Sequence, residues 1–208
     1  MNKPVLTYFD FDGGRGEPLR VALHIGGVAF EDRRIPLKDW PTMRDQTPFQ
    51  ALPTLEAGGA LVSQSNSLLR YAGKLAGLYP KDDVQALLCD EILDAAEDIG
   101  SRIGSTINMP PEEKQKAREA LAAGALKHHL KQLQALLVRG GGQYFVEKRL
   151  TVADLKVFQL LRWLRSGALD HIPKDLLDSA APQLAQYFER IGAEPGITGY
   201  YAARKKAA

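Results

Sequence analysis

The chain has 208 residues, of which 45% are hydrophobic and 25% charged, an ordinary balance for a globular protein. Its 27 basic and 25 acidic side chains give a net charge of +2, which excludes a broad field that would attract nucleic acid or an anionic membrane. One cysteine excludes an internal disulfide framework, no stretch reaches the roughly 20 apolar residues of a membrane span, and the first residues lack a signal-peptide pattern. We therefore expect a cytoplasmic protein.

The first third of the chain begins with a strand, helix and strand pattern. "PVLTYF" (residues 4–9) is strand-like, and "GEPLRVALHI" (16–25) places apolar residues at helical spacing. "GGVAFEDRRI" (26–35) then offers a second strand after a glycine pair that can end the helix. Because a helical crossover joins them, the two strands are expected to lie parallel in one sheet.

A hairpin and a helix complete this part of the chain. The strands "PTLEA" (53–57) and "ALVS" (60–63) are linked only by Gly58 and Gly59, which permit positive φ at both turn positions. "SNSLLRYAGKLAGL" then begins on a capping serine, Ser65, and continues as a helix to Gly77. These elements predict a small mixed sheet with helices.

The second part of the chain has helical periodicity and no strand pattern. Residues 83–103 and 112–137 form long periodic stretches that are typical of helices. The segment "GLYPKDD" interrupts the periodicity and is expected to be the linker. We therefore predict an α/β domain over 1–80 and an all-α helical bundle over 83–208.

One buried-helix signal in the second part is structural. Thr151 precedes an apolar helix, and Asp154 stands three positions later, which is the spacing of a capping box. Cys89 lies in an apolar stretch and is expected to be a buried, inert thiol. His128 and His129 are neighbours, so they face different directions in a helix and no metal site is expected.

Four segments of the first domain place polar or aromatic residues where a sheet core does not need them. They surround Tyr8, Trp40, Pro53 and Ser65. Ligands of open α/β sheets bind beyond the carboxyl ends of the strands, so these segments are expected to meet in one cleft. A helix start at Ser65 would receive a carboxylate, and a cis peptide at Pro53 would present backbone groups to a ligand.

The order of these motifs resembles that of the cytosolic glutathione transferases, most nearly the sigma class (prostaglandin D synthase-like). The resemblance rests on "LTYF", "EDRRI", "DWP", "LPTLE", "SQSNSLLRYA" and, in the helical part, "TVADL". It implies a thioredoxin-like first domain that binds glutathione and a helical second domain that supplies a hydrophobic pocket. It also implies an enzyme of detoxification that conjugates glutathione, its co-substrate, to small hydrophobic electrophiles.

The resemblance also assigns residues. Tyr8 would donate its hydroxyl to the glutathione sulfur, and because a free thiol has a pKa of about 8.5, such a donor would raise the thiolate population. Trp40 and Arg44 would hold the glycine carboxylate, and Asp98 would reach a second subunit's glutathione, which implies a homodimer. The implied glutathione contacts are Tyr8, Phe9, Arg15, Trp40, Arg44, Gln50, Leu52, Pro53, Gln64, Ser65 and Asp98, and the implied electrophile pocket is Phe11, Gly14, Arg102, Ser105 and Tyr200.

Two departures and several alternatives accompany these assignments. The loop between Tyr8 and Arg15 is one residue longer than the family pattern, and two glycines could absorb the insertion. Arg102 and Ser105 replace an aromatic wall of the prostaglandin synthases, which favours a general transferase. The alternatives are a glutathione-dependent isomerase or hydroperoxide reductase, and a non-enzymatic binding or structural protein. Taken singly, Tyr8 could also fill a structural hydrogen bond, and Arg15 could pair with a nearby acid.

Overall fold

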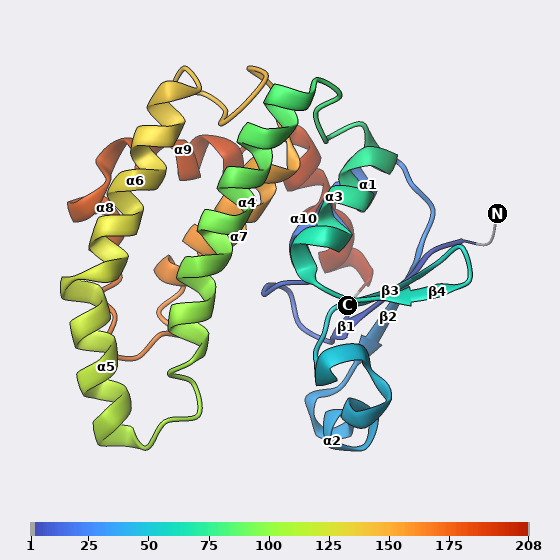
Figure 1. The fold of residues 1–208 in the computed structure, drawn as a ribbon, viewed down its shortest axis with the longest axis horizontal. Helices are drawn as coiled ribbons and strands as arrows, with labels where there is room; N and C mark the ends of the chain where they lie inside the picture. Colours follow the sequence, from blue (N-terminus) through green and yellow to red (C-terminus); the bar gives the residue numbers. More distant parts are fainter. Residues whose placement is uncertain (1–2, 208) are drawn as a thin grey trace. The chain divides into compact units, whose positions relative to one another are not determined.

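A computed structural model describes residues 3–207, which divide into two units (Figure 1). Unit 1 contains the described residues up to Tyr79 together with those from Pro195 onward, and unit 2 is Pro80–Glu194. The helix that begins at Pro195 thus belongs to the same unit as the sheet. No helix within residues 3–207 has the length and apolar character of a membrane span.

Unit 1 is built on a four-stranded mixed sheet in the order β2-β1-β3-β4. Strand β1 (Val5–Phe9) pairs in parallel with β2 (Glu31–Ile35) and antiparallel with β3 (Thr54–Ala57). Strand β4 (Ala60–Val62) closes the predicted hairpin, with Gly58 and Gly59 at φ values of 59° and 84°. The strand, helix, strand and hairpin pattern read from the sequence is thus confirmed.

The helices of unit 1 pack closely because of small residues at their crossings. A Cβ atom on Gly26 would lie 2.5 Å from Ala76, so the ends of α1 and α3 approach each other directly. A Cβ atom on Gly196 would lie 2.8 Å from Ile25, which brings α10 against α1. The helices of this unit are α1 (Glu17–Ile25), α2 (Trp40–Met43), α3 (Ser65–Ala76) and α10 (Pro195–Ala207), with short 3-10 turns at Leu37–Asp39, Arg44–Gln46 and Pro48–Gln50.

Unit 2 is entirely helical between its loops, with α7 almost wholly buried. The sequence predicted a single helix over 112–137, but the structure has two, because Gly124 leaves the helical region at φ −115° and ψ −94°. Cys89 is buried within this unit, as predicted. The helices of unit 2 are α4 (Asp83–Gly104), α5 (Pro111–Ala123), α6 (Ala125–Arg139), α7 (Val152–Arg165), α8 (Leu176–Ala180) and α9 (Pro182–Gly192).

The predicted capping box begins α7 and is part of a larger buried cluster. The Asp154 carboxylate accepts hydrogen bonds from the Thr151 backbone at 2.8 Å, the Phe145 backbone at 3.2 Å and the Tyr187 hydroxyl at 2.9 Å. Burial raises the pKa of Asp154 to about 6, although these donors oppose the rise. The cluster joins α7 to α9 and to the preceding loop, which is a structural role.

Candidate functional site

The register of the sheet brings the four predicted segments to one edge. Phe9 at the end of β1 is paired with Ile35 at the end of β2, so the loops that follow both strands leave at the same side. Thr54 at the start of β3 lies opposite Thr7, and Val62 at the end of β4 lies opposite Leu55. The chain before β3 and after β4 therefore reaches that edge as well. Three of the four segments follow carboxyl ends of strands, as the sequence analysis expected, and Pro53 joins them because β3 runs antiparallel to β1.

Tyr8 is buried at this edge and carries a hydroxyl group. Its ring packs against Ile35 and Leu52, with Phe9 and Trp40 beside them, and the residue is 6% exposed. The backbone N–H of Arg15 donates to the Tyr8 hydroxyl oxygen at 3.0 Å. Burial raises the pKa of Tyr8, and the Arg15 N–H only partly offsets this rise. The side chain is consequently a neutral phenol near pH 7.

The glycines of the loop after β1 permit this contact. Gly13 and Gly14 have φ values of 139° and 64°, which favour glycine. A Cβ atom on Gly14 would lie 2.3 Å from the Tyr8 hydroxyl, and one on Gly16 would lie 2.4 Å from its ring. Only glycine therefore lets the backbone pass this close to Tyr8. The contact of Arg15 with the Tyr8 end of the site is made by its backbone.

Trp40, Arg44 and Gln50 lie in the segment that follows β2. Trp40 begins α2 and meets the Phe9 ring edge to face, with centroids 5.5 Å apart. Arg44 is exposed, and its Nε lies 3.5 Å from the Asp45 carboxylate. Gln50 is exposed at the end of the turn Pro48–Gln50, with φ 49°. An exposed guanidinium and an indole at the sheet edge suit a ligand carboxylate.

The segments around Pro53 and Ser65 have unusual backbone conformations. The Leu52-Pro53 peptide is cis, the conformation that the sequence analysis considered for this position. Gln64 has φ 76°, a value that costs a non-glycine residue about 1–3 kcal/mol and that recurs at ligand sites. Ser65 is the first residue of α3 and is buried. The first turn of α3 therefore presents backbone N–H groups at the edge where Tyr8 lies, and these groups suit an anion.

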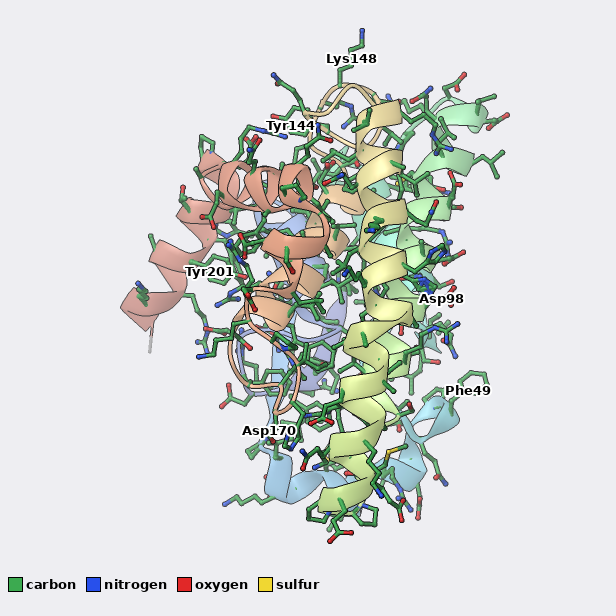
Figure 2. All side chains as sticks on the ribbon, turned by 90° about the vertical axis from the view of Figure 1, so that its left-hand side faces the viewer. Phe49, Asp98, Tyr144, Lys148, Asp170 and Tyr201 are labelled. Atoms are coloured by element: carbon green, nitrogen blue, oxygen red, sulfur yellow. The ribbon has the colours of Figure 1, made fainter. Side chains whose placement is uncertain are left out.

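The residues predicted for the electrophile pocket belong to both units. In unit 1, Phe11 is partly exposed and stacks on Phe9, whereas Tyr200 is buried against His24. In unit 2, Arg102 and Ser105 are exposed near the end of α4, where the Ser105 hydroxyl donates to the Arg102 carbonyl. Asp98 is exposed on the same helix (Figure 2). Their joint role remains a prediction.

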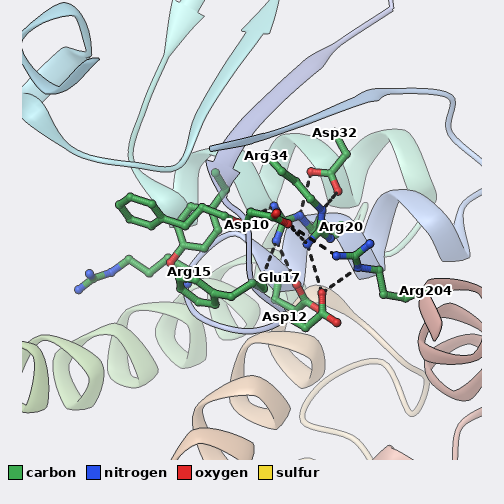
Figure 3. Close-up of polar contacts among 11 residues, drawn as sticks. Asp10, Asp12, Arg15, Glu17, Arg20, Asp32, Arg34 and Arg204 are labelled. Atoms are coloured by element: carbon green, nitrogen blue, oxygen red, sulfur yellow. Dashed lines mark hydrogen bonds and ion pairs between the residues drawn. The ribbon is translucent and has the colours of Figure 1, made fainter. Parts of the chain in front are cut away.

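A buried charge cluster beside Tyr8 was missed by the sequence analysis (Figure 3). The guanidinium of Arg20 is fully buried and pairs with Glu17 and Asp32. The available signal was a lone arginine within the apolar stretch "PLRVAL". The cluster extends through Arg34 and Asp12 to Arg204 on α10. Among residues 3–207, no group of three or more histidine, cysteine or acidic side chains is arranged to hold a metal ion.

Comparisons with known proteins identify the family. Residues 97–204 match the family model described as "Glutathione S-transferase, C-terminal domain". The chain is 33% identical over 205 residues to Glutathione S-transferase 1 of Ascaris suum, covering 97% of this chain and 96% of that protein. It is 30% identical over 204 residues to Hematopoietic prostaglandin D synthase of Gallus gallus, covering 98% and 97%.

A solved structure agrees with these matches. Prostaglandin synthase D of Nilaparvata lugens superposes with a TM-score of 0.85 at 29% identity, covering 98% of each chain. The shared architecture is a thioredoxin-like sheet unit with a helical unit. The chain belongs to the glutathione S-transferase family, which confirms the resemblance drawn from its motifs.

Proposed function

We propose that this protein is a transferase that joins the sulfur of reduced glutathione to small hydrophobic electrophiles. The observation that carries the proposal is the Tyr8 hydroxyl, buried at the shared strand edge and bound by the Arg15 N–H. Membership of the family supports the same reaction.

The proposed chemistry depends on Tyr8 remaining a donor. The Arg15 N–H occupies a lone pair of the hydroxyl oxygen, and burial raises the pKa of Tyr8, so the phenol keeps its proton and can donate a hydrogen bond to sulfur. A donor that stabilises the thiolate lowers the thiol pKa from about 8.5. It therefore increases the fraction of glutathione that is present as the nucleophilic thiolate. The sulfur then forms a bond to the electrophilic carbon, the leaving group departs with the electron pair, and the thiol proton passes to solvent.

The remaining edge residues would hold the rest of glutathione. Arg44 and Trp40 are proposed to bind the glycine carboxylate, because the guanidinium is exposed and cationic. The Leu52 backbone is proposed to pair with the cysteinyl amide. Gln64 and Ser65 are proposed to bind the γ-glutamyl end, because the first turn of α3 offers N–H groups and the positive end of its dipole.

The first test is conjugation of glutathione to a chromogenic aryl halide. Tyr8→Phe is expected to lower kcat/KM roughly 200-fold, because one preorganised donor to a developing anion is lost. Tyr79→Phe is the matched control, since its ring lies beside Lys74 and outside the Tyr8 cluster. Wild-type turnover by the Tyr8 variant would contradict the thiolate role, and a wild-type protein that binds glutathione without turnover would indicate a binding protein.

The prostaglandin D synthase relatives favour isomerisation as a second candidate. It would use the same thiolate and differ only in the electrophile pocket. A panel that includes aryl halides, hydroperoxides and an endoperoxide, assayed with the same protein, ranks these reactions. The primary proposal requires the highest kcat/KM for an aryl or alkyl electrophile.

We further propose a cytoplasmic homodimer. A reducing compartment keeps the thiol substrate available. Each unit exposes large apolar side chains, including Phe49 at 78% (Figure 2) and Leu37 at 65% in unit 1, and Leu87 at 68% in unit 2. Burial of these side chains between two subunits would remove apolar surface from water, which favours association. Sedimentation should therefore give twice the monomer mass of 22.9 kDa, and Phe49→Ser should shift the protein toward monomer. A wild-type monomer at micromolar concentration would contradict the dimer.

A further inference from the structure

Arg20 contacts the loop that carries Arg15 at three carbonyl groups. Its side chain donates to the Phe9 carbonyl at 3.1 Å and to the Phe11 carbonyl at 3.0 Å. Its own backbone N–H donates to the Gly16 carbonyl at 3.2 Å. The last of these is the first backbone hydrogen bond of α1. The guanidinium itself binds the residues before Arg15 and also lies beside Glu17, the first residue of α1, so it contacts both ends of the segment between β1 and α1 (Figure 3).

Two carboxylates fix the orientation of this guanidinium. Nε of Arg20 donates to Asp32 at 2.9 Å, and Nη1 lies 3.3 Å from Glu17. The side chains of Arg20 and Glu17 are fully buried. The guanidinium carbon also lies 5.5 Å from the centroid of the Tyr8 ring. The planar guanidinium has five N–H donors and can bind these two carboxylates and the two loop carbonyls at the same time, whereas a lysine ammonium cannot.

The loop needs such an anchor because its own sequence is permissive. Gly13, Gly14 and Gly16 lie on either side of Arg15, and glycine restricts the backbone least of all residues. The useful conformation is nevertheless narrow, because the Arg15 N–H must stay at 3.0 Å from the Tyr8 oxygen. Restraint must therefore come from outside the loop, and the Arg20 guanidinium binds Phe9 and Phe11 before Arg15 and Glu17 after it.

We propose that Arg20 is a positioning residue for thiolate formation: its buried guanidinium holds the loop so that the Arg15 amide donates to the Tyr8 hydroxyl. This inference rests on the proposed transferase function. Arg20 does not contact the sulfur in this scheme and acts through the Arg15 amide and Tyr8. It affects the ionisation of the bound thiol rather than the affinity for glutathione.

The test compares Arg20→Lys with Arg33→Lys. Arg33 lies on β2 and forms exposed ion pairs with Glu31 and Glu56, so it controls for loss of a guanidinium in the same sheet. The pKa of enzyme-bound glutathione is measured from the ultraviolet absorbance of the thiolate, together with kcat and KM. Arg20→Lys is expected to lower the thiolate fraction at pH 7 and kcat about tenfold, with KM for glutathione changed less than about twofold. Arg33→Lys should match the wild type.

A second variant keeps the inference falsifiable if Arg20→Lys does not fold. Asp32→Asn removes one charge that orients Arg20 but leaves the buried side chains in place, because the Asp32 side chain is 27% exposed. It is expected to lower the thiolate fraction about threefold. A folded Arg20→Lys with the wild-type thiol pKa, or an unchanged Asp32→Asn when Arg20→Lys is unfolded, overturns the inference.

Failure of the proposed function gives a different result. If Tyr8→Phe leaves the bound-thiol pKa unchanged, the transferase mechanism itself is wrong, and Arg20 has no thiolate to position. If Tyr8→Phe raises that pKa and Arg20→Lys does not, only the role of Arg20 is wrong. A loss of stability with an unchanged thiol pKa assigns Arg20 to the fold alone.

Discussion

Tyr8 in unit 1 and Tyr187 in unit 2 are both buried tyrosines, but their hydroxyl groups make opposite contacts. Tyr187 donates to the Asp154 carboxylate at 2.9 Å, so its proton is used within the fold. Tyr8 accepts from the Arg15 N–H at 3.0 Å. Burial raises the pKa of both side chains. The two side chains therefore differ in the direction of the hydrogen bond and not in burial or in the direction of the pKa shift. The Tyr187 proton is used to stabilise the start of α7, whereas the Tyr8 proton is available to a ligand.

The same substitution in both regions should separate activity from stability. Tyr8→Phe carries the largest expected effect, the roughly 200-fold loss of kcat/KM given above. Tyr187→Phe should lower the free energy of unfolding by about 2 kcal/mol, because it removes a hydrogen bond to a buried charged group. Denaturant unfolding measures this loss, and kcat/KM of the folded Tyr187 variant should equal that of the wild type. A loss of catalysis by folded Tyr187→Phe would contradict the assignment of Tyr187 to stability alone.

The close approach of the loop to Tyr8 gives the next largest effect. Gly16→Ala would place a Cβ atom 2.4 Å from the Tyr8 ring, so either the ring or the Arg15 amide must move. We expect kcat/KM to fall about tenfold, in proportion to a misplaced donor. Gly199→Ala is the matched control, since a Cβ atom there meets nothing within 4 Å. Equal kinetics for the two alanine variants would show that the spacing around Tyr8 does not matter.

The smallest expected effect concerns the dependence of kcat/KM on pH, which should show no decrease on the alkaline side. The pKa of Tyr8 is raised from its ordinary value of 10.0, so the phenol stays protonated while the thiol ionises. The kcat/KM for glutathione should therefore rise with thiol ionisation and then stay level up to about pH 9. A fall between about pH 8 and 9 would mean that Tyr8 loses its proton there and that its pKa is lowered rather than raised.

Local patterns made much of the fold predictable. The Gly58-Gly59 turn, the capping box at Thr151 and the parallel pair around α1 each depend on residues close in the sequence, and the structure has all of them. The break at Gly124 was not predicted, because the apolar periodicity continues on both sides of it. Periodicity reports which face is buried, and it does not report where the backbone interrupts its hydrogen bonds.

The candidate site was predictable to a smaller extent. Strand order brings Tyr8, Trp40, Pro53 and Ser65 to one edge, and a pattern of strands is sufficient to expect this. The anchoring of the loop was not predictable, because Arg20 pairs with Asp32 across twelve positions and with backbone carbonyls that carry no sequence signal. Charged pairs of this kind depend on the folded path of the chain.

The place of α10 in unit 1 has a consequence for the order of folding during synthesis. Arg204 donates to Asp12 at 3.0 Å across 192 positions, so Asp12 meets this partner only after 192 further residues have been made. All of unit 2 is translated between the two parts of unit 1, and domains generally begin to fold as they leave the ribosome. The helical unit can therefore fold on a nascent chain, whereas the sheet unit gains α10 only after the whole of unit 2 has been translated.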